Sequence, residues 1–285
     1  MTTRYLVTGA GGMLGHDLRV VLEGRDATFT TRADLDVTDA DAVAAAVPGH
    51  DVVINATAYT RVDDAETHED DALLINATAV GHLAAAAAAA GAHLVHVSTD
   101  YVFAGNASAP YREDAPRHPL GAYGRSKAEG ERLALELNPG ATSIVRTAWL
   151  YGQHGPNFAK TMLRLAGERE TVTVVADQLG QPTWTADLAH QIVAMLDSGA
   201  PAGIYHGTNS GQTSWYEFAR AVFEGAGLDP DRVEPTDSSQ FVRPAPRPAY
   251  SVLGHDAWAT AGLSPMRPWA DALQSAFSTG ALGAE

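Results

Sequence analysis

Cysteine is absent from the 285 residues of this chain. Its absence excludes disulfide bonds, thiolate metal sites and cysteine nucleophiles, and it suits a reducing, cytoplasmic location. Purely apolar runs of the roughly 20 residues that span a membrane are also missing, so we expect no membrane-spanning helix. The first residues lead straight into a strand and a glycine loop without a long apolar segment or a small-residue cleavage site, so we expect no leader peptide.

Positive charge is scarce. The chain has 34 acidic against 19 basic residues, a formal net charge of −15, and its only lysines are Lys127 and Lys160. Such a surface repels phosphate backbones and anionic lipids, so we expect no nucleic-acid or membrane partner. A polyanionic ligand must therefore meet a local positive pocket. The acidic excess would suit a high-salt cytoplasm, although an Ala- and Arg-rich coding bias gives a similar composition.

Short, β-branched apolar runs alternate with helix-forming segments along the first 150 residues. The runs predict strands at 4–10, 27–31, 51–57, 93–99 and 142–148, and the segments between them predict helices at 13–24, 39–49, 69–91 and 123–137. Repeated βα units of this size imply a parallel sheet with helices on both faces. The predicted fold class is α/β, with a Rossmann-type doubly wound sheet.

Beyond Trp149 the alternation loosens. Helices are predicted at 157–168, 185–199 and 214–227, with strands at 172–177 and 203–209. We therefore predict a nucleotide-binding domain over 1–150, completed by segments within 172–209, and a smaller, mainly substrate-binding α/β domain over 151–285.

A glycine pattern occupies the first predicted turn from strand to helix. Gly9, Gly12 and Gly15 leave the backbone bare where it can approach a pyrophosphate at a helix N-terminus. At the end of the second strand, Arg32 could pair with a 2′-phosphate, which favours NADPH. The nearby acids Asp34 and Asp36 keep NADH open.

Three polar residues are candidates for catalysis. Tyr123 and Lys127 are four residues apart, so they share one face of a helix, and Thr99 ends a buried strand, where open α/β sheets place ligands. Each signal is weak by itself. A strand-end hydroxyl is often only hydrogen-bonded locally, and any tyrosine followed by a lysine matches the spacing.

Together, the glycine pattern, "STDYVF" (98–103) and Tyr-x-x-x-Lys in "YGRSK" (123–127) resemble the extended short-chain dehydrogenase/reductase family. Within it, the chain is similar to reductases of dTDP-linked 4-dehydro sugars through nearly its whole length. The segments that carry this closer similarity are "LDVTD" (35–39), "NATAYTRVDDAE" (55–66), "YGRSKAEGE" (123–131), "VRTAWLYG" (145–152), "NFAKTMLRLA" (157–166), "DQLGQPT" (177–183) and "RPAYSVL" (247–253).

The resemblance implies hydride reduction of a sugar C4 ketone with Thr99, Tyr123 and Lys127 as the catalytic set. Tyr123 would donate a proton, Lys127 would supply the positive charge that a phenolate needs and hold the cofactor ribose, and Thr99 would orient the ketone. Cofactor contacts are implied at Gly12, Met13 and Leu14 for the pyrophosphate, Asp36 and Val37 for the adenine, and Ala58, Tyr59 and Thr60 for the nicotinamide half.

The resemblance also implies substrate contacts. The family pattern places Val62, Thr99, Asp100, Tyr101 and Trp149 around the sugar, with Asn157 and Arg247 near the nucleotide diphosphate. A tryptophan that follows a strand is equally a core residue, and an arginine in a proline-rich loop is often only solvated.

Other functions stay open at the level of sequence. An epimerase uses the same machinery, and the fold group includes the regulatory subunit of methionine adenosyltransferase, which binds a partner. Dehydratases of the family carry an acid pair after the threonine, whereas here Tyr101 follows Asp100. No metal-binding or hydrolase motif occurs, and His93 and His96 point to opposite faces of a strand, as ordinary packing or surface residues do. Some reductases of this kind are described with magnesium at a subunit contact, so Mg²⁺ and a homodimer stay open without an assignable ligand.

Overall fold

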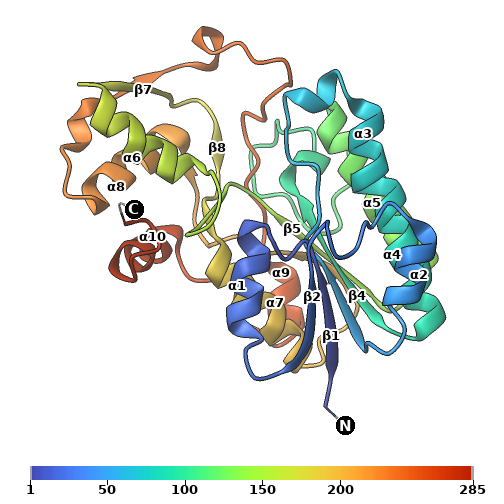
Figure 1. The fold of residues 1–285 in the computed structure, drawn as a ribbon. Coiled ribbons are helices and arrows are strands. Elements are labelled where there is room, and N and C mark those ends of the chain that lie inside the picture. Colours follow the sequence, from blue (N-terminus) through green and yellow to red (C-terminus); the bar gives the residue numbers. More distant parts are fainter. Residues whose placement is uncertain (1, 284–285) are drawn as a thin grey trace.

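The computed structural model describes residues 2–283, and a six-stranded parallel sheet forms its centre (Figure 1). The strand order is β10-β5-β4-β3-β1-β2. The strands are β1 (Arg4–Thr8), β2 (Asp26–Thr30), β3 (Val52–Asn55), β4 (His93–Thr99), β5 (Thr142–Thr147) and β10 (Gly203–His206). The predicted Rossmann-type fold is confirmed. The late segment β10 extends the sheet by pairing in parallel with β5.

Helices cover both faces of this sheet. On one face lie α1 (Met13–Val21), α7 (Thr185–Asp197) and the short α9 (Asp256–Thr260), and on the other lie α2 (Ala40–Ala46), α4 (Ala79–Ala90) and α5 (Ala122–Leu137). The first face buries a cluster that includes Leu18, Ile192 and Trp258, and the second buries one that includes Val43 and Leu83. Each fully buried leucine or isoleucine contributes roughly 1.5–3 kcal/mol, so these two layers stabilise the sheet that carries the site.

The helix predicted over 69–91 is interrupted. It consists of α3 (Glu69–Leu73), a π-helical turn (Leu74–Thr78) and α4, and it ends at Gly91, whose φ of 67° is left-handed. In the π turn, the Asn76 side chain accepts a hydrogen bond from Tyr59 N at 2.8 Å and donates to Tyr59 O and Ser126 Oγ. Asn76 therefore links the backbone of Tyr59 to Ser126 on α5. Such π turns are frequent at functional sites.

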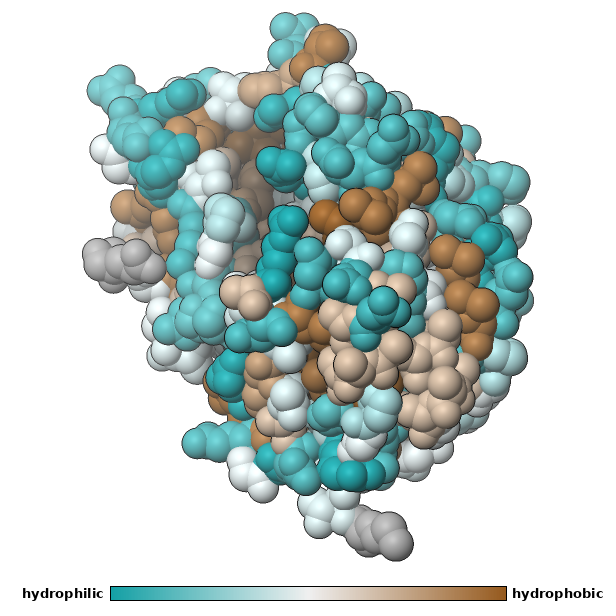
Figure 2. Space-filling view, turned by 45° about the vertical axis from the view of Figure 1, so that its right-hand side comes forward, coloured by the Kyte–Doolittle hydropathy of each residue, from teal (hydrophilic) through white to brown (hydrophobic). Residues whose placement is uncertain are grey.

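Within residues 2–283, the segment Glu69–Ala90 is long and apolar enough to cross a membrane by length and composition alone. Half of its apolar window is buried inside the protein, where Leu83, Ala84 and Ala87 pack against the sheet. Its alanines are explained by this close packing. On the face seen in Figure 2, polar residues lie beside apolar groups at the centre, along the right side and in the hollow at upper left.

The C-terminal part has a hydrophobic core of its own. Helix α8 (Trp215–Gly225) packs on the parallel pair β7 (Val172–Val175) and β12 (Val233–Thr236). Helix α6 (Phe158–Glu168) contacts β7 and α8, and α10 (Trp269–Ser278) packs on α8. Two short ladders join this part to the end of the sheet: β6 (Leu150–Tyr151) pairs with β9 (Thr183–Trp184), and β8 (Leu179–Gly180) pairs with β11 (Thr213–Ser214). The division into two domains near residue 150 stays a prediction.

Candidate active site

The glycine loop joins β1 to α1 at the carboxyl end of the sheet. Gly9 has a φ of 76°, and a Cβ there would lie 2.7 Å from the Ala56 backbone. A Cβ at Gly15 would lie 2.4 Å from Gly9 O. Gly12 caps α1 without a side-chain hydrogen bond, so the first N–H groups of the helix face outward. This arrangement suits a pyrophosphate at the helix N-terminus.

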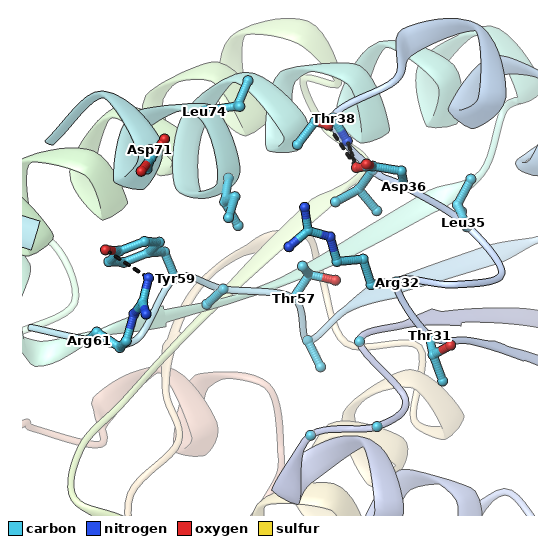
Figure 3. A pocket seen from close by; sticks show the side chains of 17 residues that line it. Thr31, Arg32, Leu35, Asp36, Thr38, Thr57, Tyr59, Arg61, Asp71 and Leu74 are labelled. Atoms are coloured by element: carbon cyan, nitrogen blue, oxygen red, sulfur yellow. Dashed lines mark hydrogen bonds between the residues drawn. The ribbon is translucent and has the colours of Figure 1, made fainter. Parts of the chain in front are cut away.

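A cavity of about 550 Å³ opens beside this loop (Figure 3). Arg32 and Arg61 enter it from opposite sides, and α3 with the π turn closes it from above. Of the predicted cofactor residues, those in its wall are Gly9, Gly12, Arg32, Asp36, Val37, Ala58 and Tyr59. Within the described part of the chain, the wall does not include Met13, Leu14, Gly15, Thr60, Tyr123 or Lys127. The wall residues that could not be predicted from the sequence are Gly11, Thr31, Leu35, Thr38, Ala56, Thr57, Arg61, Asp71, Leu74 and Ile75.

The two acids near Arg32 accept hydrogen bonds from residues within their own turns. Asp34 accepts hydrogen bonds from Thr31 N at 2.9 Å and Thr31 Oγ1 at 2.7 Å. Asp36 accepts from Thr38 Oγ1 at 2.7 Å and Thr38 N at 3.0 Å. These bonds, with a smaller contribution from Arg32, hold the pKa of the Asp36 carboxyl below its usual range. The Arg32 side chain reaches into the cavity between Thr57 and Asp36 (Figure 3), which leaves its guanidinium facing any bound anion.

Thr99 and Tyr123 lie together at the end of β4. The Thr99 hydroxyl donates to Asp100 Oδ1 at 3.0 Å and accepts from Tyr101 N at 3.2 Å. Tyr123 lies in the first turn of α5, and a Cβ at Gly124 would come within 2.3 Å of Tyr101 O, so this turn packs directly on the strand end. Burial raises the pKa of Tyr123 to about 12, with the Thr99 hydroxyl opposing the rise. Tyr123 is therefore a protonated phenol at neutral pH.

Lys127 is buried one helical turn further along α5. Its Nζ donates to Val97 O at 2.7 Å and lies 3.3 Å from His96 Nε2. Burial lowers the pKa of Lys127 to about 8, and the charge of Glu131 opposes this. We expected the Lys127 charge to favour the phenolate of Tyr123. The structure differs, because burial of the phenol outweighs any such help and its pKa is raised.

The predicted substrate residues fall into two groups. Arg247 Nη2 pairs with Asp63 Oδ2 at 2.8 Å beside Val62, and its charge lowers the pKa of Tyr101 against a larger rise from burial. The Tyr101 ring meets the Tyr123 ring edge-on, with centroids 5.5 Å apart. The structure therefore brings one group together at Thr99, Asp100, Tyr101, Val62 and Arg247.

Trp149 and Asn157 form the second group, next to the C-terminal core. Trp149 has a left-handed φ of 47° and stacks on Trp215 with ring centroids 3.6 Å apart. Asn157 caps α6: its Oδ1 accepts from Lys160 N at 3.1 Å and its Nδ2 donates to Gly152 O at 3.0 Å. The polar atoms of Asn157 are thus engaged inside the protein, and its role as a substrate contact stays a prediction.

No group of three or more His, Asp or Glu side chains that could hold a metal ion is found in residues 2–283. A nicotinamide dinucleotide fits the cavity better, because the wall combines bare glycine backbone, a helix N-terminus and Arg32.

Comparison with known proteins supports the same interpretation. The family model described as the RmlD substrate binding domain matches residues 3–281. A dTDP-4-keto-6-deoxy-D-glucose reductase of Streptomyces niveus is 50% identical over 281 residues, which cover 97% of each chain. A dTDP-4-dehydrorhamnose reductase of Streptomyces griseus is 50% identical over 282 residues, which cover 96% of this chain and 93% of that one.

Solved structures are similar over their full length. A dTDP-4-dehydrorhamnose reductase from Bacillus anthracis, in complex with NADP, has a TM-score of 0.94 at 39% identity and covers 98% of this chain and 100% of that one. The corresponding protein from Clostridium acetobutylicum has a TM-score of 0.93 at 40% identity and covers 97% and 99%.

Proposed function

This chain belongs to the family described as the RmlD substrate binding domain, and on that premise we propose that it reduces the C4 ketone of dTDP-4-dehydro-L-rhamnose to give dTDP-L-rhamnose. The reductant in this proposal is NADPH, with NADH as the weaker alternative. A relative of this name binds NADP, and Arg32 offers the cation that a 2′-phosphate requires. We expect the enzyme to act in the cytoplasm, and a homodimer stays a prediction.

The convergence of Thr99 and Tyr123 at one strand end carries the proposal. When bound, the reduced nicotinamide supplies a hydride. The Tyr123 phenol donates its proton to the ketone oxygen, and its raised pKa ensures that the proton is present at neutral pH. The Thr99 hydroxyl orients the same oxygen, and Lys127 holds the ribose of the cofactor. Gly12 and Arg32 contact its phosphate groups.

A second candidate is the reduction of another dTDP-linked 4-keto-6-deoxy sugar. It is favoured by one observation, since relatives with the same 50% identity carry different substrates in their names. The predicted sugar contacts Val62, Tyr101 and Trp149 are the residues at which such a difference in specificity would arise.

The test is an absorbance assay at the reduced-nicotinamide band with each dTDP-linked sugar and each cofactor. We expect oxidation of NADPH with dTDP-4-dehydro-L-rhamnose, loss of ~100-fold or more in turnover for Tyr123→Phe, and normal turnover for Tyr216→Phe, a tyrosine on α8 whose hydroxyl meets Arg220. No oxidation with any sugar and either cofactor would refute a reductase. Conversion of the sugar without net oxidation would identify an epimerase instead, and full activity of Tyr123→Phe would exclude the proton-donor role.

A further inference from the structure

A line of buried hydrogen bonds runs across the sheet from the cavity to Lys127. Thr57, in the cavity wall, donates its backbone N–H to Asn55 Oδ1 at 3.0 Å. Asn55 Nδ2 lies 3.1 Å from His96 Nδ1, and His96 Nε2 lies 3.3 Å from Lys127 Nζ. Asn55, His96 and Lys127 are each at most 1% exposed. The proposed reduction uses neither Asn55 nor His96.

The Asn55 amide has only one orientation that satisfies its neighbours. Its Oδ1 accepts both the Thr57 backbone N–H and the Thr8 hydroxyl, the latter at 2.9 Å. A backbone N–H can only donate, so the atom facing it must be the amide oxygen. The NH₂ group of Asn55 is therefore turned toward His96.

This orientation decides which nitrogen of His96 carries the proton. Burial lowers the pKa of His96 well below its usual range, so the ring is neutral and holds one proton. His96 Nδ1 accepts from Asn55 and must present a lone pair. The single proton is then on Nε2, the nitrogen that faces Lys127.

An N–H group at that place cannot hydrogen-bond an ammonium. The ammonium of Lys127 has three donors and no acceptor, whereas its neutral amine has a lone pair that accepts the His96 proton. The second contact, from Nζ to Val97 O at 2.7 Å, is satisfied in both forms. Only the amine satisfies every bond in the line.

We propose that His96 is a positioning residue that holds the Lys127 nitrogen beside Val97 and favours its neutral amine, with the histidine proton fixed on Nε2 by Asn55. The significance of this role rests on the proposed function, in which Lys127 belongs to the catalytic set. His96 then determines the pH at which Lys127 changes charge.

The other charged groups around Lys127 do not cancel the effect of His96 on its pKa. Glu131, on the same helix, acts to raise the pKa of Lys127, but burial has the larger effect. Glu131 is itself paired with Arg146 at 2.7 Å and Arg117 at 3.4 Å. The titratable groups that face Lys127 or its contacts are Tyr123 and Glu131 on α5, His96 on β4, Arg146 on β5, and Arg117 and Asp100 in the loops that follow β4.

The scarcity of lysine gives a direct test. Protein labelled with carbon-13 at lysine Cε has two signals, from Lys127 and Lys160, and each can be followed through a pH titration without any substrate. In His96→Gln a carbonyl oxygen can face the ammonium, so we expect the Lys127 titration to move up by roughly one pH unit. The Lys160 curve should coincide between the two proteins and reports that the fold is kept. His93→Gln, on the same strand with its ring against Ser143, is the matched control and should leave the Lys127 titration unchanged.

Nitrogen-15 spectra of the histidines test the proton position in the unmodified protein, so the proposal stays falsifiable if His96→Gln does not fold. We expect His96 as the neutral Nε2–H form from about pH 6 to about pH 9. An Nδ1–H form, an imidazolium, or an unchanged Lys127 titration in His96→Gln would each overturn the proposal. Neither spectrum depends on turnover, so a protein that reduces no sugar would refute the proposed function and leave this result standing.

Discussion

Asp100 carries a buried charge that costs stability. Its side chain is 3% exposed, and Oδ2 finds no hydrogen-bond partner among residues 2–283. Burial raises the pKa of Asp100 from 3.8 to about 6. The folded protein therefore binds a proton that the unfolded chain has released between about pH 4 and about pH 6, and stability falls as the pH rises through that window.

Asp100→Asn should remove this penalty. We expect the free energy of unfolding to rise by up to about 3 kcal/mol near pH 8, and the gain to shrink toward zero near pH 4, because a shift of two pKa units corresponds to about that energy. Urea unfolding at both pH values measures the difference. Asp114→Asn, an exposed acid paired with Arg112 at 3.1 Å, is the control and should show little gain. An equal gain at both pH values would contradict the titration of Asp100.

Lys127→Arg should lose most of the turnover. The compact amino group of Lys127 lies between His96 Nε2 at 3.3 Å and Val97 O at 2.7 Å, whereas a guanidinium is broad and planar and cannot give up its proton. We expect turnover to fall by ~100-fold or more and overpacking to cost roughly 1–3 kcal/mol of unfolding free energy. Lys160→Arg, which keeps a cation near Gln153 O, is the control for both measurements. Turnover close to normal in Lys127→Arg would show that any buried cation suffices.

Two glycines of the β1–α1 loop, Gly15 and Gly12, differ in the space around them. A Cβ at Gly15 would collide with Gly9 O at 2.4 Å and with Ala10 Cα at 2.6 Å, both of which are backbone atoms that cannot swing away. A Cβ at Gly12 would meet Gly9 O at 3.4 Å and would otherwise point toward the cavity side of the loop.

Gly15→Ala and Gly12→Ala should therefore fail differently. We expect Gly15→Ala to lower the melting temperature markedly, since a forced backbone shift costs roughly 1–3 kcal/mol or more. Gly12→Ala should melt close to the unmodified protein and bind NADPH at least ~10-fold more weakly, as judged by calorimetric titration. Equal melting temperatures for both variants would mean that the helix approaches the strand less closely than the backbone distances indicate.

The sequence predicted those elements whose cause is local. β-branched runs marked the strands, and glycine marked the first turn and the end of α4. Thr99 and Tyr123 were also predicted, because strand ends and helix spacing follow from periodicity. The π turn at Asn76 was not, because its cause is a hydrogen bond to Tyr59, a residue 17 positions away.

Contacts between segments far apart in the chain could not be predicted from the sequence for the same reason. His96 was interpreted as a packing or surface residue, and the alignment of α5 on β4 that puts it beside Lys127 cannot be obtained from spacing within either element. Arg61 lies in the segment between β3 and α3 and lines the cavity because this segment folds back beside it. Arg247 forms an ion pair with Asp63, which is far from it in the sequence.

The charge of the whole molecule sets its response to salt. A formal net charge of −15 means that at least 15 of the 34 acidic side chains have no basic side chain of their own to pair with. Surface pairs such as Arg25 with Asp197 at 2.6 Å and Arg125 with Glu69 at 2.7 Å are each worth about 0–1 kcal/mol and weaken in salt. Repulsion among the excess acids is spread over the polar surface seen in Figure 2 and weakens in salt as well.

We expect the weakening of repulsion to outweigh the weakening of ion pairs, so that the melting temperature rises with KCl. The Debye length falls from about 10 Å at 0.1 M to about 3 Å at 1 M, which is short enough to screen neighbouring carboxylates but not to break close pairs in contact. A rise of several degrees between these concentrations is expected, and it should exceed the rise in sucrose of equal osmolality, which excludes itself from the surface without screening charge. A melting temperature that stays flat from low to molar KCl would rule out a surface adapted to a high-salt cytoplasm and leave coding bias as the source of the acidic excess.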